Sequence, residues 1–125
     1  MRTDVRWTAV LAPLNVASTD HRLLTLDFTL TAHTPLALLE DLPHAPVIGT
    51  VDDAEVHQGI ILAHGTLTDP ATATRMSSGE LRPQIDLHDT TVTHRDGLTV
   101  FHSGLLGAVR AGTRPVWPAA RFHID

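Results

Sequence analysis

The sequence predicts a mainly β protein, a single antiparallel β-barrel with one short helix. Three observations lead to this fold class. About seven short segments alternate apolar and polar residues, which is the pattern of strands buried on one face. Asp96-Gly97, between two such segments, is the strongest hairpin signal in the chain. A single segment carries both start and stop signals for a helix. Many short strands with one helix are typical of a closed or semi-closed barrel.

The first two strands are expected near the N-terminus. Residues 5–11 alternate apolar and polar side chains, and Pro13 ends the segment. Residues 24–30 give the clearest two-residue period in the sequence, with one apolar face and one wet face. The apolar face of this second strand is expected to hold Leu24, Leu26, Phe28 and Leu30.

Two further strands are expected at residues 47–51 and 60–67. Asp52-Asp53 is expected to form the turn between them. Gly59 and Gly65 mark bends or bulges, because glycine inside a strand pattern often does so.

The helix is expected over residues 70–78. Asp69 can cap its N-terminus, a proline occupies the first helical position, and Gly79 suits the position after its end. Four Ser and Thr residues favour this helix little, so it should be short and held by tertiary contacts.

The Asp96-Gly97 hairpin has a predictable register. Its strands cover residues 90–95 and 98–103. A two-residue turn places Thr93 opposite Val100 and Val92 opposite Phe101.

A last strand is expected over residues 105–113. Pro115 and Pro118 follow it, and proline cannot donate to a strand ladder. Regular pairing is therefore expected to end there.

Composition limits the function classes. At 125 residues, the chain forms one domain over 1–125. Cysteine is absent, which excludes disulfides and thiolate zinc sites. The net charge of −5 argues against nucleic acid as a partner. Neither an apolar run long enough to span a bilayer nor a secretory signal is found, so no membrane association is expected.

Nine histidines raise the question of a metal site. His57 and His64 are seven residues apart, and His94 and His102 are expected on opposite faces of the hairpin. The spacings typical of paired metal-ligating histidines do not occur. We therefore expect scattered surface histidines and neither a metal nor another cofactor.

Residues 79–87 read Gly-Glu-Leu-Arg-Pro-Gln-Ile-Asp-Leu. They resemble the nucleophile strand of the capsid maturation (prohead) proteases of tailed phages, which reads roughly G-x-L-R-G-V-S-V-D-L. Other segments resemble further parts of that family in the same order along the chain. These segments are 7–13 (WTAVLAP), 34–39 (TPLALL), 43–51 (PHAPVIGTV), 63–71 (AHGTLTDPA) and 111–122 (AGTRPVWPAARF).

The resemblance implies a barrel of the herpesvirus assemblin type, in which a serine is the nucleophile and a histidine the general base. His44 matches the family's histidine, in a segment that is about two residues shorter up to Gly49. Pro83-Gln84 replaces the Gly-Val-Ser that holds the serine. An amide cannot be deprotonated to attack a carbonyl, so Gln84 cannot act as a nucleophile. The chain resembles a degenerate member without its catalytic serine.

Three serines could replace the lost nucleophile. Ser77 and Ser78 lie at the end of the predicted helix and are expected to face solvent. Ser103 has His102 beside it, but neighbours on a strand point to opposite faces and cannot hydrogen-bond through their side chains.

The leading hypothesis is a non-catalytic capsid protein, a minor component or a decoration protein that binds the major capsid protein. Its location would be the virion, and the host cytoplasm during assembly, with self-association on the capsid as a further expectation. One alternative is an active maturation protease with a rearranged catalytic set. Another is a small β-barrel binding module unrelated to capsids.

The partner interface is expected near the chain ends. Trp7 lies in the first strand, and a proline-rich terminus carries further aromatic and arginine residues, which are typical interface anchors. These terminal residues are Arg114, Trp117, Arg121 and Phe122. A terminus folded back over its own barrel is the alternative reading.

Overall fold

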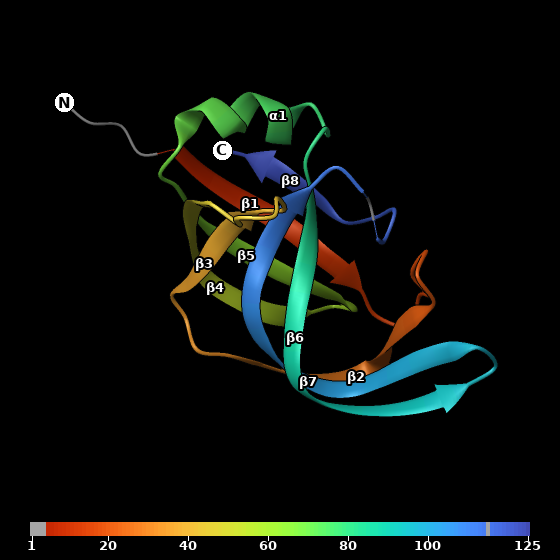
Figure 1. Cartoon of the computed structure of the whole chain (residues 1–125). Helices are drawn as coiled ribbons and strands as arrows, with labels where there is room; N and C mark the ends of the chain where they lie inside the picture. Colours follow the sequence, from red (N-terminus) through yellow and green to blue (C-terminus); the bar gives the residue numbers. More distant parts are fainter. Residues whose placement is uncertain (1–4, 115) are drawn as a thin grey trace.

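The computed structural model describes residues 5–114 and 116–125, and these residues form a mainly β protein. A 3₁₀ turn, η1 (Pro70–Thr72), leads directly into one short helix, α1 (Ala73–Ser77) (Figure 1). Within the described ranges, no helix has the length and apolar character needed to cross a bilayer. The strands are β1 (Val5–Pro13), β2 (Arg22–Ala32), β3 (Leu36–Glu40), β4 (Val47–His57), β5 (Ile60–Leu67), β6 (Arg82–Arg95), β7 (Leu98–Gly112) and β8 (Arg121–Ile124).

Strand β7 organises one half of the sheet. Along one edge it pairs with β6 in an antiparallel ladder. Its other edge is shared, because β2 pairs in parallel with Thr99–Leu106 and β3 pairs in parallel with Val109–Ala111. Parallel pairing in this half differs from the antiparallel sheet that was expected. β2 and β3 follow each other in the chain, and they pair one after the other along the same edge of β7.

The other half of the sheet is antiparallel, in the order β3-β4-β5-β1-β8. The ladder does not close, because β6 and β8 each pair with one neighbour among the described residues. The mainly β class with one short helix is confirmed, but the sheet is not closed into a barrel. Arg82 on β6 bridges the open side with two hydrogen bonds. Its Nε donates to the Ala120 carbonyl at 2.6 Å, and a terminal nitrogen donates to the Pro118 carbonyl at 2.6 Å.

Local signals located several elements correctly. Asp69 accepts a hydrogen bond from the Ala71 amide at the start of the helical segment, and Gly79 after its end has a φ of 82°. Strand β5 has the expected bounds. The hairpin register is confirmed, with Thr93 opposite Val100 and the next pair as predicted.

The turn expected at Asp52-Asp53 is wrong. Strand β4 continues through both residues, with a register shift between Val51 and Asp53 that marks a β-bulge. The chain turns instead at Gln58-Gly59, where both residues have positive φ, 49° and 82°. Positive φ at both central positions suits a tight hairpin turn.

Leu26 departs from the predicted apolar face of β2 and is 68% exposed. The register runs from Leu24 opposite Phe101 to Thr29 opposite Ser103, so β2 contains three extra residues between these points. This irregularity turns Leu26 outward while Leu24 and Phe28 stay buried.

The C-terminal third is more regular than predicted. The strands expected at 98–103 and 105–113 are one continuous strand, β7, of 15 residues. The chain also pairs again after Pro118, because β8 forms an antiparallel ladder with β1. Figure 1 shows the β6–β7 hairpin extending from the body beside β2, and α1 near β8 at the opposite end.

The core lies inside the curved sheet and includes both tryptophans, Trp7 and Trp117. A Cβ on Gly65 would lie 1.8 Å from the Thr50 carbonyl oxygen and 2.9 Å from the Trp7 ring. Gly65 lies opposite the bulge in β4 and is a position of close backbone approach, where its missing side chain leaves room for the indole.

Candidate functional site

The first half of β6 alternates buried and half-buried residues. Leu81, Pro83 and Ile85 are buried, whereas Arg82 and Gln84 are only half-buried. Since strand side chains alternate between faces, the polar side chains share the outward face of the sheet. Gln84, which the sequence resemblance aligns with the serine of the prohead proteases, thus belongs to a polar row on the outside of the strand.

The Gln84 side chain is fixed by the chain's own C-terminal segment. Its Nε2 donates to the Arg114 carbonyl at 2.9 Å. A Cβ on Gly112 would lie 2.7 Å from this nitrogen and 3.1 Å from the Asp41 carboxylate. The amide therefore occupies space that a side chain at position 112 would take. Its donor is used internally, and it supplies no nucleophile.

Arg110 joins the polar row to the β3–β4 loop. Its Nε donates to Asp86 Oδ2 at 2.8 Å, and its NH1 lies 4.0 Å from Asp41 Oδ1. All three side chains are partly exposed, so each pair contributes little stability. The arrangement pairs the carboxylates with a guanidinium and does not aim them at a nucleophile.

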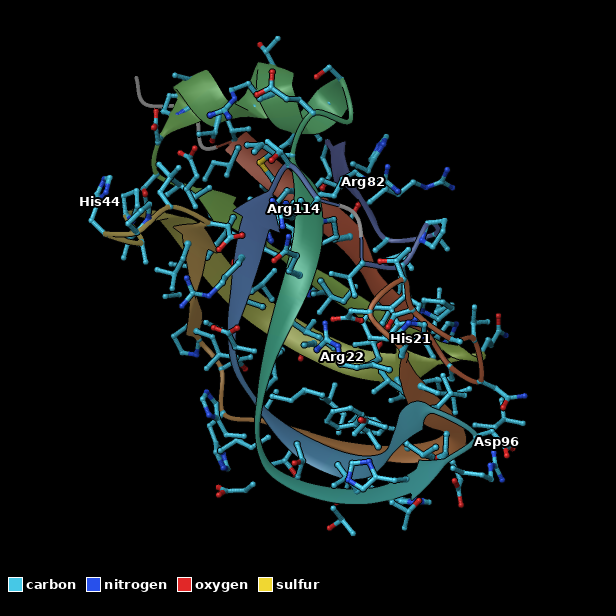
Figure 2. All side chains as sticks on the ribbon, turned by 45° about the vertical axis from the view of Figure 1, so that its right-hand side comes forward. His21, Arg22, His44, Arg82, Asp96 and Arg114 are labelled. Carbon is cyan, nitrogen blue, oxygen red and sulfur yellow. The ribbon has the colours of Figure 1, made fainter. Side chains whose placement is uncertain are left out.

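His44 is not brought to this row. It is exposed on the loop between β3 and β4, and Figure 2 shows it at the outer end of that loop, directed away from the strand that carries Arg82. The loop is held by a hydrogen bond from the Ala45 amide to the Leu42 carbonyl. The structure therefore does not pair His44 with Gln84.

The alternative serines lack a histidine partner. Ser77 and Ser78 are exposed at the end of α1, and the Ser78 hydroxyl donates to the Arg75 carbonyl at 3.0 Å. His102 lies 2.9 Å from the Thr93 hydroxyl instead of bonding to Ser103. Among the described residues, no serine hydroxyl is hydrogen-bonded to a histidine ring.

The histidines do not gather into a metal site in the described part of the chain. His57 ends β4, whereas His64 lies within β5 and approaches Asp53 to 3.8 Å. Residues 5–114 and 116–125 contain no group of three or more His, Asp or Glu placed to hold an ion.

The expected aromatic anchors are core residues. Trp7, Trp117 and Phe122 are 0%, 1% and 6% exposed, so they offer almost no surface to a partner in the folded chain. The rings of Trp7 and Phe122 meet edge to face, with centroids 5.6 Å apart. Arg114 and Arg121 are exposed. The interface expectation therefore fails for the aromatic residues and leaves these two arginines.

The C-terminal segment is held down at several points. The Trp117 indole N–H donates to the Val16 carbonyl at 2.8 Å, and the Arg22 guanidinium lies 5.3 Å from the centre of the Trp117 rings. Arg22 is itself hydrogen-bonded to Asp20 at 2.9 Å. The terminus folded back over its own sheet, the alternative reading, is the one observed.

Sequence reasoning missed Arg82 and Arg110 as organising residues. Each contacts residues that are 24 or more positions away in the chain, so no local spacing marks them. The outward orientation of Gln84 was not predicted either, although its place between the apolar residues Pro83 and Ile85 is a local signal for it.

Comparison of the chain with protein-family models, with curated proteins and with solved structures finds no match.

Proposed function

We propose that this protein is a non-catalytic capsid-associated protein, a minor or decoration component that binds the major capsid protein through a fold related to the prohead proteases. One observation is the main support for the proposed absence of catalysis. At the family's serine position stands Gln84, and its amide is hydrogen-bonded to the Arg114 carbonyl. A strand that once presented a nucleophile here serves to fasten the C-terminal segment.

The surroundings support the same proposal. Asp86 is paired with Arg110, and His44 points away at a loop tip. A hydrolase needs a nucleophile and a base within hydrogen-bond reach of each other. Neither Gln84 nor the alternative serines meet that requirement, so the retained property would be binding.

The ordered sequence resemblance supports the family relation. Its segments fall on β1, β3, β4, β5 with the following helical segment, β6, and the end of β7 through β8. The sheet would then be an opened form of the family's assemblin-type barrel, in which Arg82 holds the edges β6 and β8 together by side-chain hydrogen bonds.

The decisive experiment mixes purified protein with unprocessed major capsid protein and with assembled capsids. We expect co-sedimentation with capsids, no cleavage of the precursor, and no labelling by a fluorophosphonate probe. Stoichiometric labelling of any serine, or precursor cleavage, would instead show a protease with a rearranged catalytic set. Absence from the capsid pellet would favour a β-sheet binding module unrelated to capsids.

The candidate attachment surface consists of the predicted interface residues that are exposed in the structure. Arg114 and Arg121 are the interface candidates that remain accessible, and arginine suits protein interfaces because its planar fork pairs with carboxylates. A protein with both arginines changed to glutamate should lose capsid co-sedimentation, whereas Arg95→Glu at the distant β6–β7 turn should keep it. Equal binding by all three proteins would exclude the arginines as anchors.

A further inference from the structure

The outward face of the antiparallel half of the sheet is hollowed. One hollow of about 400 Å³ lies over β1 and β8, and another of about 240 Å³ lies over β4 and β5. Both are lined by Thr8 and Leu62, so they adjoin. Together they form one groove that crosses four strands in the order β4-β5-β1-β8.

The strand register arranges the groove in two rows of side chains on one face, because residues directly opposite each other in antiparallel strands share a face. The first row is Asp53, His64, Thr8 and His123. The second row is Glu55, Leu62, Val10 and Arg121.

Two β-bulges border these rows. In β4 the register shifts between Val51 and Asp53, just before the first row. In β1 it shifts between Val10 and Ala12, just after the second row. Bulges bend a strand and increase its twist, and they are common next to binding sites. Both bulges therefore lie at the borders of the hollowed face.

The groove is polarised. Its β4 end carries the carboxylates of Asp53 and Glu55, its β8 end carries Arg121, and Leu62 and Val10 form a half-buried apolar floor between them. Within the described residues, neither Glu55 nor Arg121 has a side-chain hydrogen bond or ion pair. Charges of opposite sign thus stand free at the two ends of an apolar floor.

We propose that this groove binds an extended peptide segment that crosses the strands, with a basic residue over Asp53 and Glu55 and an acidic residue over Arg121. Three interstrand spacings of about 4.8 Å separate the ends by about 14 Å. An extended peptide advances about 3.3 Å per residue, so residues four apart span this distance and face the same side. The ligand pattern is therefore basic-x-apolar-x-acidic. The groove does not include the Gln84 row, and it shares only Arg121 with the proposed capsid surface. The peptide test below needs no capsid, so its outcome is distinguishable from that of the capsid experiment.

The test is an NMR titration of the ¹⁵N-labelled protein with three capped five-residue peptides at millimolar concentration. The mixed peptide is Lys-Thr-Val-Thr-Glu, and its controls are Glu-Thr-Val-Thr-Glu and Lys-Thr-Val-Thr-Lys. The mixed peptide should shift the amides of the two rows and bind up to about fivefold more tightly than either control, since one exposed ion pair is worth up to about fivefold in affinity. Equal shifts from all three peptides, or shifts elsewhere on the protein, would overturn the proposal.

Variants at the two ends make the test specific. The double change Asp53→Lys and Glu55→Lys should transfer the preference to the acidic peptide, and Arg121→Glu should transfer it to the basic peptide. Asp27→Lys, an exposed position on β2, should leave the preference unchanged. Unshifted amides outside the groove show that each variant is folded. A folded end variant that keeps the wild-type preference would show that the groove does not select by charge.

Discussion

Arg82→Ala should lower the free energy of unfolding more than an ordinary surface change, because Arg82 joins the two open edges of the sheet. Its guanidinium donates to the carbonyls of Ala120 and Pro118, both at 2.6 Å. Ala120 is fully buried, so truncation leaves its carbonyl without this donor.

The magnitude follows from these two bonds. A hydrogen bond from a charged donor contributes about 1.5–3 kcal/mol, and a solvent-exposed bond lies below that range. The partly buried bond to Ala120 and the exposed bond to Pro118 therefore give a loss of about 2–3 kcal/mol. At about 2.1 cal/mol/K per residue, a chain of 125 residues unfolds with an entropy of about 0.26 kcal/mol/K. The expected fall in Tm is about 8–12 °C.

Urea denaturation and thermal melting of the wild type, Arg82→Ala and Arg82→Lys measure the effect. Lysine keeps the charge but lacks the planar fork that reaches two carbonyls, so it should recover less than half of the loss. The matched control is Arg95→Ala at the β6–β7 turn. Among the described residues its side chain has no hydrogen bond or ion pair, and its change should stay within about 0.5 kcal/mol.

Two results would refute this reasoning. If Arg82→Ala matches Arg95→Ala, the bridge between the edges contributes no stability. If Arg82→Lys is as stable as the wild type, charge alone acts and the fork geometry is irrelevant. Hydrogen exchange adds a local test, because β8 amides should exchange faster in Arg82→Ala.

Three further changes test other parts of the fold. Gly65→Ala should prevent folding, because the new Cβ would lie 1.8 Å from a β4 carbonyl oxygen, whereas Gly104→Ala, whose nearest contact is a side-chain methyl at 3.3 Å, should remain folded by urea denaturation. Burial raises the pKa of Asp20, but hydrogen bonds from neighbouring serine and arginine side chains and the arginine charge outweigh it, so the pKa lies below 3.8. The stability that the ionised Asp20 carboxylate contributes is present above pH 3.8 and is lost as the pH falls through the pKa of the folded state. In urea denaturation, Asp20→Asn should therefore be less stable than the wild type near neutral pH but equal to it in strong acid. Removal of residues 114–125 should leave an unfolded chain by circular dichroism, because it removes two buried aromatic side chains and all of β8.

The sequence predicted those elements whose signals lie within a few residues of each other. The Asp69 cap, the glycine after the helix and the Asp96-Gly97 turn depend on local backbone geometry, and all are observed. The Asp52-Asp53 turn failed because acidic residues suit both turns and bulges. The pairing of β4 with β5 continues past both residues, and only this pairing shows that they form a bulge and not a turn.

The parallel half of the sheet was beyond the reach of such signals. The pairs of β2 and β3 with β7 join residues more than 70 positions apart, and their alternation is the same in parallel and antiparallel partners. The polar row of the candidate site was similarly inaccessible. Neither the outward position of Gln84 nor its bond to the Arg114 carbonyl was predicted, and the bond depends on how the terminus returns to the sheet.

The terminus shows why an aromatic residue near prolines is ambiguous in sequence. Large aromatic side chains are enriched both in interfaces and in cores, so Trp117 and Phe122 fitted either role. For Phe122 the structure decides in favour of the core. The four residues of β8 pair with β1, and this pairing places Phe122 against Trp7 inside the sheet. The same pairing places Arg121 on the outward face, at the end of the groove away from Glu55. One short strand therefore places Phe122 in the core and provides the cationic end of the proposed peptide site.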